Sequence, residues 1–276
     1  MILEILKTIL LGIVEGITEW LPVSSTGHMI LLEEFVSFQN VTEGFWSMFE
    51  VVVQLGAILA VVLLFWNQIF PFSFKKGEAF VKKDIMALWF KILVSCVPAA
   101  VIGVAFSDQM EALFYNYTTV AVMLILFGIA FIVIETRNHG KNAKINSLTE
   151  LTYQTALMIG VFQLIAAIFP GTSRSGATIV GALLLGVSRT VAAEFTFFLA
   201  IPVMFGASLL KLLKFGLNFT GLEIAVLLVG MITAFVVSVL VIKFLMDYIK
   251  KHDFKVFGWY RIVLGMIVLA YFAVIG

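Results

Sequence analysis

Residues 21–27, Leu-Pro-Val-Ser-Ser-Thr-Gly, interrupt an apolar stretch that runs from about residue 1 to residue 45. A second interruption, Phe-Pro-Gly-Thr-Ser-Arg-Ser-Gly at residues 169–176, lies in the middle of another apolar stretch, at about 148–188. Non-helical backbone is tolerated at membrane depth only where protein or water covers it. Each stretch is therefore predicted to form a re-entrant helix–loop–helix hairpin that enters and leaves the membrane on one side.

The sequence around these two interruptions is strongly apolar. Of the 276 residues, 62% are hydrophobic and 13% are charged, whereas soluble domains have about 45–50% apolar and about 25% charged residues. A spanning helix needs roughly 20 mainly apolar residues. Six segments meet this requirement, at about 49–66, 85–106, 118–135, 190–212, 222–243 and 258–275. We therefore expect an all-α polytopic membrane protein, with six transmembrane helices and the two hairpins in one integral membrane domain over residues 1–276.

Charge and cysteine content exclude several classes of function. The net charge of +1, from 18 Lys and Arg against 17 Asp and Glu, gives no general attraction to nucleic acid. Cys96 is the single cysteine, so the chain cannot form an internal disulfide or a thiolate metal cluster. The segment from Met1 to Pro22 resembles a signal peptide. However, glutamates interrupt it and no small-x-small cleavage site follows, so we expect it to remain in the mature protein.

The distribution of Lys and Arg predicts the orientation in the membrane. Basic residues are concentrated in three loops: Lys75, Lys76, Lys82 and Lys83; Arg137, Lys141 and Lys144; and Lys250, Lys251 and Lys255. The segment 107–117 has no Lys or Arg. Placing the three basic loops in the cytoplasm puts both termini outside. Lys211 and Lys214, near an outer loop, are then a minor exception.

The two hairpins resemble each other when the second is shifted by 148 residues. The shift aligns Gly12–Glu15 with Gly160–Gln163, Pro22 with Pro170, Ser24 with Thr172 and Ser25 with Ser173. Because three spans separate the hairpins, the halves, roughly 1–135 and 148–276, would have inverted topology. Inverted repeats with broken helices place a binding site where the halves meet. The similarity is short, and coincidence is the alternative explanation.

Two carboxylates lie in the first hairpin, where ionisable groups are costly and therefore functional candidates. Glu15 and Glu19 are four residues apart, so on a helix they project from one face. Like charges at this spacing repel unless a cation lies between them. The cation is a divalent metal, an arginine or a shared proton. The structural alternative is a pair of carboxylates in the wet mouth of a hairpin.

The polar residues that follow Pro22 are candidates for catalysis and anion binding. Ser24 and Ser25 are typical helix N-cap residues, followed by Thr26, and free N–H groups at a helix start bind anions. His28 is three residues beyond Ser25, which suits a base near a hydroxyl. Taken alone, the hydroxyl cluster and the histidine are more often structural than catalytic.

The second interruption has the composition of a phosphate-binding loop. It combines a glycine, hydroxyl groups and an arginine: Gly171, Thr172, Ser173, Arg174, Ser175 and Thr178. The planar guanidinium group offers a fork of donors that matches phosphate oxygens. The loop lacks the Gly-Lys-Ser/Thr sequence of a Walker motif. The structural alternative is an arginine that only satisfies carbonyls in an unwound turn.

Glu50 and Gln54, at helical spacing, add a second polar face, and Glu194 occupies the corresponding place in the second half. Either glutamate could pair with Arg174, Arg189 or a backbone amide. For Glu194 we expect this structural role.

Three stretches, residues 15–28, 49–56 and 170–178, resemble the motifs of the bacterial undecaprenyl-diphosphate phosphatase family associated with bacitracin resistance. The resemblance extends over essentially the whole chain. It implies a plasma-membrane enzyme that hydrolyses undecaprenyl diphosphate to undecaprenyl phosphate and inorganic phosphate, which recycles the lipid carrier for peptidoglycan and other envelope polymers.

The resemblance also implies roles for individual residues. The acidic motif of the family carries over to Glu15 and Glu19, which would hold Mg²⁺ or Ca²⁺. Its hydroxyl and histidine positions carry over to Ser25, Thr26 and His28, and its basic motif carries over to Ser173, Arg174 and Thr178. The site of the family opens to the outer face of the membrane.

Two chemical schemes are compatible with these residues. In one, Ser25 attacks the terminal phosphorus with His28 as base. In the other, His28 or a glutamate activates water, and Ser25 only binds. Glu50, Gln54 and the loop hydroxyls, including Ser24, Thr172 and Ser175, would bind the phosphate groups. A second copy of the chain, in a homodimer, is a candidate partner.

Other functions remain as alternatives. Inverted repeats with broken helices are typical of carriers, so the main alternative function is a transporter of polyprenyl phosphate or ions. A lipid phosphatase of the phosphatidic-acid type is the second, although no second histidine accompanies Arg174.

Overall fold

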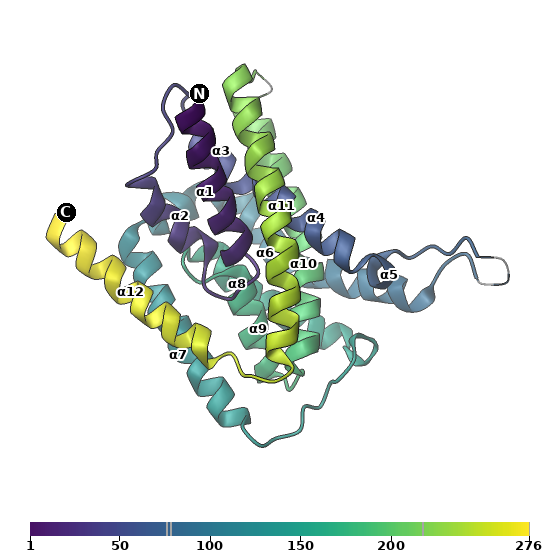
Figure 1. The fold of residues 1–276 in the computed structure, drawn as a ribbon. Coiled ribbons are helices and arrows are strands. Elements are labelled where there is room, and N and C mark those ends of the chain that lie inside the picture. The colour runs from purple at the N-terminus through teal and green to yellow at the C-terminus, as the bar shows by residue number, and fades with distance from the viewer. Residues whose placement is uncertain (76, 78, 217, 276) are drawn as a thin grey trace.

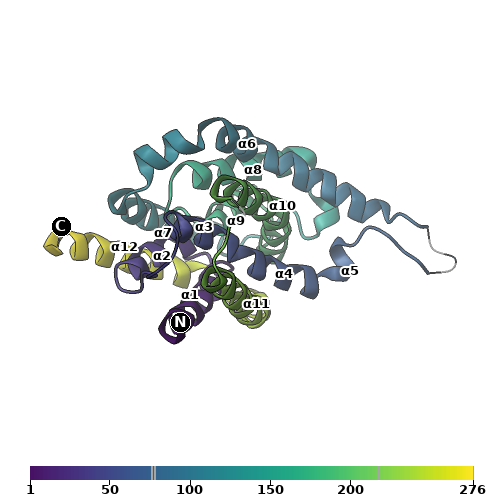
Figure 2. The same cartoon turned by 90° about the horizontal axis from the view of Figure 1, so that it is seen from above.

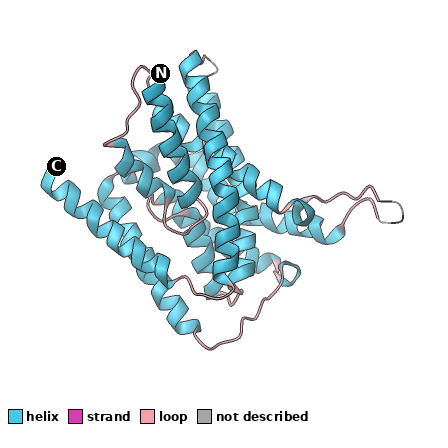
Figure 3. Ribbon diagram, in the orientation of Figure 1, coloured by secondary structure: helices cyan, strands magenta, loops and turns pink. Residues whose placement is uncertain are grey.

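The computed structural model describes residues 1–75, 77, 79–216 and 218–275. Within these residues the chain forms helices and loops, and no β-strand (Figures 1 and 3). The helices of the first half are α1 (Ile2–Thr18), α2 (Ser25–Glu33), α3 (Phe45–Val52), α4 (Gln54–Leu64), α5 (Trp66–Ile69), α6 (Lys83–Phe114) and α7 (Tyr117–Asn138). After the short 3₁₀ helix η1 (Leu148–Glu150), the second half contains α8 (Tyr153–Ile168), α9 (Arg174–Leu184), α10 (Arg189–Phe215), α11 (Gly221–Ile249) and α12 (Lys255–Ile275).

The six predicted spans are confirmed as helices long and apolar enough to cross a membrane, among the residues that the structure describes. Two of them differ from the expectation. The first, Phe45–Leu64, is divided at Val53 into α3 and α4. The second continues beyond residue 106, because α6 runs for 32 residues to Phe114. Large apolar side chains such as Leu240 and Phe244 point outward from the bundle, which suits a lipid environment.

Both interrupted stretches fold as helix–loop–helix hairpins, α1–α2 and α8–α9. In each, a serine with positive φ caps the second helix. Ser24 (φ 74°) accepts a hydrogen bond from the backbone N–H of Gly27, and Ser173 (φ 68°) accepts one from Gly176. The structure therefore aligns Ser24 with Ser173, one residue away from the sequence alignment, which paired Ser24 with Thr172.

The first helix of each hairpin packs along a long helix from the opposite half of the chain. Helix α1 lies against α11, and α8 lies against α6 (Figures 1 and 2). Glycines allow this close approach: a side chain at Gly12 would meet the carbonyl oxygen of Gly230, and one at Gly160 would meet the backbone of Ser95. The tips of both hairpins are thereby held inside the bundle. Helices α7 and α12 form a separate, closely packed pair beside them.

The basic loops after α7 and α11 lie at the same end of the molecule. Arg189, at the start of α10, pairs with Glu135 of α7 at 2.6 Å, and Glu135 also accepts the backbone N–H of Phe254. This network connects α7, the start of α10 and the loop that precedes α12. Neither arginine considered as a partner of Glu194 pairs with it, because Arg189 pairs with Glu135 and Arg174 with Glu19. Lys76, counted in the first basic loop, lies outside the described residues.

Candidate active site

Glu19 connects the tips of the two hairpins. Its Oε1 accepts a hydrogen bond from Arg174 Nη2 at 2.9 Å, and its Oε2 accepts one from Ser25 Oγ at 2.8 Å. The side chains of Glu19 and Arg174 are only 7% and 13% exposed, so water screens the ion pair little. An acidic and a guanidinium group from distant parts of the sequence thus meet at the hairpin tips.

Helical geometry places Glu19 at this point. Its backbone N–H donates to the carbonyl of Glu15, so the helical path of α1 continues through Glu19. Trp20, which follows, is fully buried and packs edge-on against Phe197 of α10, with ring centroids 5.2 Å apart. Because the neighbouring tryptophan is anchored in the core, the Glu19 carboxylate has a fixed position.

Arg174 is oriented by contacts on both sides of its guanidinium group. Nη1 donates to the carbonyl of Thr196 at 2.9 Å, while Nη2 binds Glu19. Nε is buried and has no hydrogen-bond partner. Thr178 Oγ1 donates to the Arg174 carbonyl and accepts a hydrogen bond from Thr196 Oγ1. The guanidinium group is therefore held in place by two of its five N–H donors, which leaves other donors for a ligand.

The starts of helices α2 and α9 both lie beside Glu19. Ser25 is the first residue of α2, and Arg174 is the first residue of α9. Ser175 Oγ donates to the Glu19 carbonyl at 3.2 Å and lies 3.1 Å from Ser173 Oγ. Helix N-termini carry partial positive charge and free N–H groups. The site therefore combines an arginine, two helix starts and several hydroxyl groups, which together suit a phosphate.

Arg261 of α12 joins the backbones of both loops. Its guanidinium group donates to the carbonyls of Pro22 (3.2 Å), Gly171 (2.8 Å) and Thr172 (2.7 Å). The side chain is fully buried. Gly171 has φ 86°, and a side chain there would collide with the backbone of Val120. Gly171 thus allows the turn, and its carbonyl accepts a hydrogen bond from Arg261.

Arg261 was not predicted from the sequence, although a signal was present. It is the only charged residue in the apolar segment 258–275, and an ionisable group inside a span is a functional candidate by default. Thr196 was missed as well, because it binds Arg174 through its backbone carbonyl, which any residue type provides.

Replacing Arg261 with lysine should loosen both loops at once. Lysine lacks the planar fork that reaches Pro22 and the second loop together, so buried carbonyls lose their donors. We expect a destabilisation of roughly 2–4 kcal/mol and a lower kcat. Thermal unfolding and phosphate release, both measured in detergent, check this, with the exposed Arg137→Lys as control. An unchanged unfolding midpoint together with an unchanged kcat would contradict the assigned role.

Glu15 is buried, and its Oε1 has no hydrogen-bond partner in the protein. Among the described residues, no group of three His, Cys, Asp or Glu side chains could hold a metal ion. However, Mg²⁺ commonly takes only one or two protein carboxylates and completes its shell with water and substrate phosphates. The orphaned oxygen of Glu15, one helical turn from Glu19, is compatible with such a site.

His28 does not contact Ser25. Its Nδ1 lies 2.7 Å from the carbonyl of Ser24, and its Nε2 lies 2.6 Å from the hydroxyl of Tyr260. The two rings are stacked. The hydroxyl group of Ser25 instead donates to Glu19 Oε2, so a carboxylate and not the imidazole of His28 accepts its hydrogen bond.

A polar cavity of about 290 Å³ lies between the hairpin tips and neighbouring helices. Its lining includes Thr26, Pro170, Glu50, Tyr115 and Lys211. Glu50 accepts a hydrogen bond from Tyr115 at 3.1 Å. Tyr115 belongs to the loop between α6 and α7, so the cavity extends toward that loop. Gln54 is not among the residues that line it.

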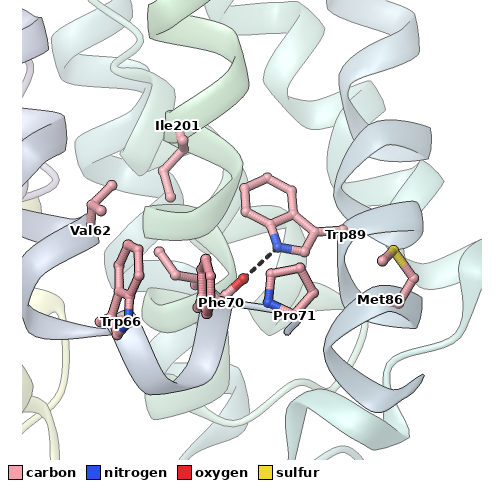
Figure 4. Close-up of a pocket in the computed structure, with 8 residues that line it drawn as sticks. Val62, Trp66, Phe70, Pro71, Met86, Trp89 and Ile201 are labelled. Carbon is pink, nitrogen blue, oxygen red and sulfur yellow. Dashed lines mark hydrogen bonds between the residues drawn. The ribbon is translucent and has the colours of Figure 1, made fainter. Parts of the chain in front are cut away.

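A second cavity, of about 320 Å³, is apolar (Figure 4). Its lining residues include Val62, Trp66, Phe70, Pro71, Trp89 and Ile201. The indole Nε1 of Trp89 donates to the carbonyl of Ile69 at 2.7 Å. This lining provides no charged group for an anion, so the cavity does not extend the phosphate site.

Comparisons with known proteins identify the family of the chain. A family model described as "Bacitracin resistance protein BacA" matches residues 8–267. An undecaprenyl-diphosphatase of Desulfitobacterium hafniense is 70% identical over 99% of this chain and 97% of its own length. Undecaprenyl-diphosphatase 1 of Clostridium acetobutylicum is 66% identical over 99% of each chain. An undecaprenyl-diphosphatase of Enterococcus faecalis is 63% identical over 97% of this chain and 96% of its own.

Proposed function

The chain belongs to the bacitracin resistance protein BacA family, and from that membership and the geometry of the site we propose that it is a membrane-bound undecaprenyl-diphosphatase. It hydrolyses undecaprenyl diphosphate to undecaprenyl phosphate and inorganic phosphate. The product is the lipid carrier that is reused in the synthesis of peptidoglycan and other envelope polymers.

The observation that carries the proposal is the contact of Glu19 with both Arg174 and Ser25. It brings a hydroxyl, a carboxylate and a guanidinium group together, which supports their roles as nucleophile, base and phosphate-binding cation. Phosphoryl transfer depends mainly on the positioning and neutralisation of phosphate oxygens. Arg174 and the N-termini of α2 and α9 supply that neutralisation.

Ser25 is the proposed nucleophile. Its Oγ attacks the terminal phosphorus while Glu19 Oε2, 2.8 Å away, accepts the hydroxyl proton. The bond between the terminal phosphorus and the bridging oxygen breaks, and undecaprenyl phosphate leaves. Water then attacks the phosphoserine, which releases inorganic phosphate and restores the Ser25 hydroxyl. In the competing scheme Glu19 or His28 activates water directly, and Ser25 only binds.

A divalent cation, Mg²⁺ or Ca²⁺, would be held by Glu15 together with Glu19. The orphaned Oε1 of Glu15 supports this assignment, because a buried oxygen without a partner needs a proton, a water or a cation. When bound, the cation would neutralise negative charge on the diphosphate.

The hairpins are proposed to be re-entrant, and the two halves to have inverted topology. The matching serine caps support the repeat, as does the reciprocal packing of α1 on α11 and α8 on α6. The basic loops support an orientation in which both termini lie outside the plasma membrane. The site then opens to the outer face, on the side of the loop that contains Tyr115.

Phosphate release by the purified protein tests this function. With undecaprenyl diphosphate and Mg²⁺ in detergent, we expect sustained release over many turnovers, and less after chelation of the metal. A carrier of polyprenyl phosphate would release none, because transport breaks no bond. Absence of release from protein with a normal unfolding transition would favour the carrier.

Changing Ser25 to alanine separates the two schemes. A nucleophilic serine predicts a loss of at least about 10³-fold in kcat, with no phosphorylated peptide on acid quenching. The wild type should give a phosphorylated peptide that contains Ser25. Ser208→Ala, which also removes a buried hydroxyl of a helix, is the matched control. Near-normal turnover by Ser25→Ala would leave the direct attack of water as the mechanism.

A further inference from the structure

A basic cavity of about 730 Å³ lies at the C-terminal end of α9. Helix α9 begins with Arg174 in the site described above and has 11 residues, so the two ends are roughly 16 Å apart. The cavity is lined by the ends of α7, α9 and α11, the start of α10 and the loop that follows α7. It shares no lining residue with the site at Glu19.

Five cations line this cavity, against one carboxylate. The cations are Arg137, Lys141, Lys144, Arg189 and Lys250. The carboxylate, Glu135, is already used by a two-point pair with Arg189 and by the backbone N–H of Phe254. Lys250 pairs with Asp247. Among the described residues, Arg137, Lys141 and Lys144 make no ion pair.

The wall of the cavity is built by backbone hydrogen bonds. The N–H groups of Lys144 and Ile145 donate to the carbonyl of Gly186, and the N–H of Ser188 donates to that of Ile145. Asn138 Nδ2 donates to the carbonyl of Leu183. The loop that presents Lys141 and Lys144 is therefore fastened across the end of α9. The two-point pair of Arg189 uses Nε and Nη2, which leaves Nη1 for another acceptor.

We propose that this cavity binds the phosphate group of an anionic phospholipid. Several unpaired cations around one cavity repel each other, and an anion relieves that repulsion. Arginine and lysine suit phosphate oxygens. The cavity lies at the end that the positive-inside rule assigns to the cytoplasm, where basic pockets between spanning helices bind anionic headgroups. The proposal concerns residues outside the active site and does not depend on the reaction.

Thermal unfolding in a nonionic detergent tests the proposal. The probes are phosphatidylglycerol, phosphatidylcholine and sodium phosphate, each added to the wild type and to Arg137→Gln/Lys141→Gln/Lys144→Gln. A ligand that binds the folded protein raises its unfolding midpoint. We expect phosphatidylglycerol to raise the midpoint of the wild type by roughly 4 °C or more and that of the triple variant by less than half as much. Phosphatidylcholine should have no such effect.

Two further variants make the result specific. Lys82→Gln/Lys83→Gln/Lys251→Gln removes three cations that do not line the cavity, and it should retain the full response. Arg137→Lys/Lys141→Arg/Lys144→Arg keeps the charges and should retain it too. Phosphate release should be unchanged in all of these variants.

The outcomes separate the two sources of phosphate. A response to sodium phosphate as large as that to phosphatidylglycerol, and lost in the triple glutamine variant, would overturn the lipid assignment in favour of a free-phosphate site. An equal response to phosphatidylglycerol in the wild type and the triple glutamine variant would overturn the site itself.

Discussion

Arg174→Lys is expected to lower kcat/KM for phosphate release by about 10²–10³-fold, the usual effect of losing one donor that stabilises a transition state. The guanidinium group binds Thr196 and Glu19 through two of its five N–H donors, which leaves others for a substrate phosphate. A lysine ammonium group is a single point of charge. It cannot keep both protein contacts and also hold the substrate in a fixed direction.

The chain contains a matched control for this substitution. Arg189 also pairs with a buried glutamate, Glu135, but at the opposite end of α9. Arg189→Lys therefore disturbs a comparable ion pair and should leave kcat/KM within about twofold. Comparable losses in both variants would mean that the effect of Arg174→Lys is a general loss of stability, which contradicts its role in the site.

Glu19→Gln is expected to lower kcat by about 10²–10⁴-fold, the range typical of removing a general base. Glutamine has nearly the same shape, and its carbonyl can still accept one hydrogen bond. It cannot take the proton of Ser25, and it does not neutralise Arg174. Because Arg174 is then free to bind phosphate, KM should stay unchanged or fall while kcat drops.

This split between kcat and KM distinguishes chemistry from a folding defect. Glu135→Gln is the control, because it removes the charge of the other buried glutamate paired with arginine. It should lower the unfolding midpoint without lowering kcat. A Glu19→Gln variant with normal kcat, or with a raised KM alone, would show that Glu19 is not the base.

Most of the architecture could be predicted from the sequence, because hydropathy and chain breaks are local signals. Apolar segments of sufficient length marked the six spans, and the segments around Pro22 and Pro170 marked the two hairpin loops. The division of the first span at Val53 carries no proline or glycine signal, so it was not anticipated. The register of the repeat also differed by one residue, because the capping serines align through backbone geometry.

The partners of individual side chains were harder to predict. Spacing within a helix suggested His28 as the base for Ser25, but the actual partner of its Nε2, Tyr260, is 232 residues away in the sequence. Similarly, the turn at Gly171 was predicted to bind phosphate, whereas the Gly171 carbonyl accepts a hydrogen bond from Arg261. Such contacts depend on the packing of α12, which no local pattern describes.

Glu19 and Arg174, which are 155 residues apart, are proposed to act as one catalytic unit. Measuring kcat/KM for undecaprenyl diphosphate in the wild type, Glu19→Gln, Arg174→Lys and the double variant tests it most directly. Residues that act as a unit are strongly non-additive. If the two residues act as one unit, kcat/KM of the double variant should be no more than about threefold below that of the slower single variant. A double variant whose loss equals the product of the two single losses would contradict it.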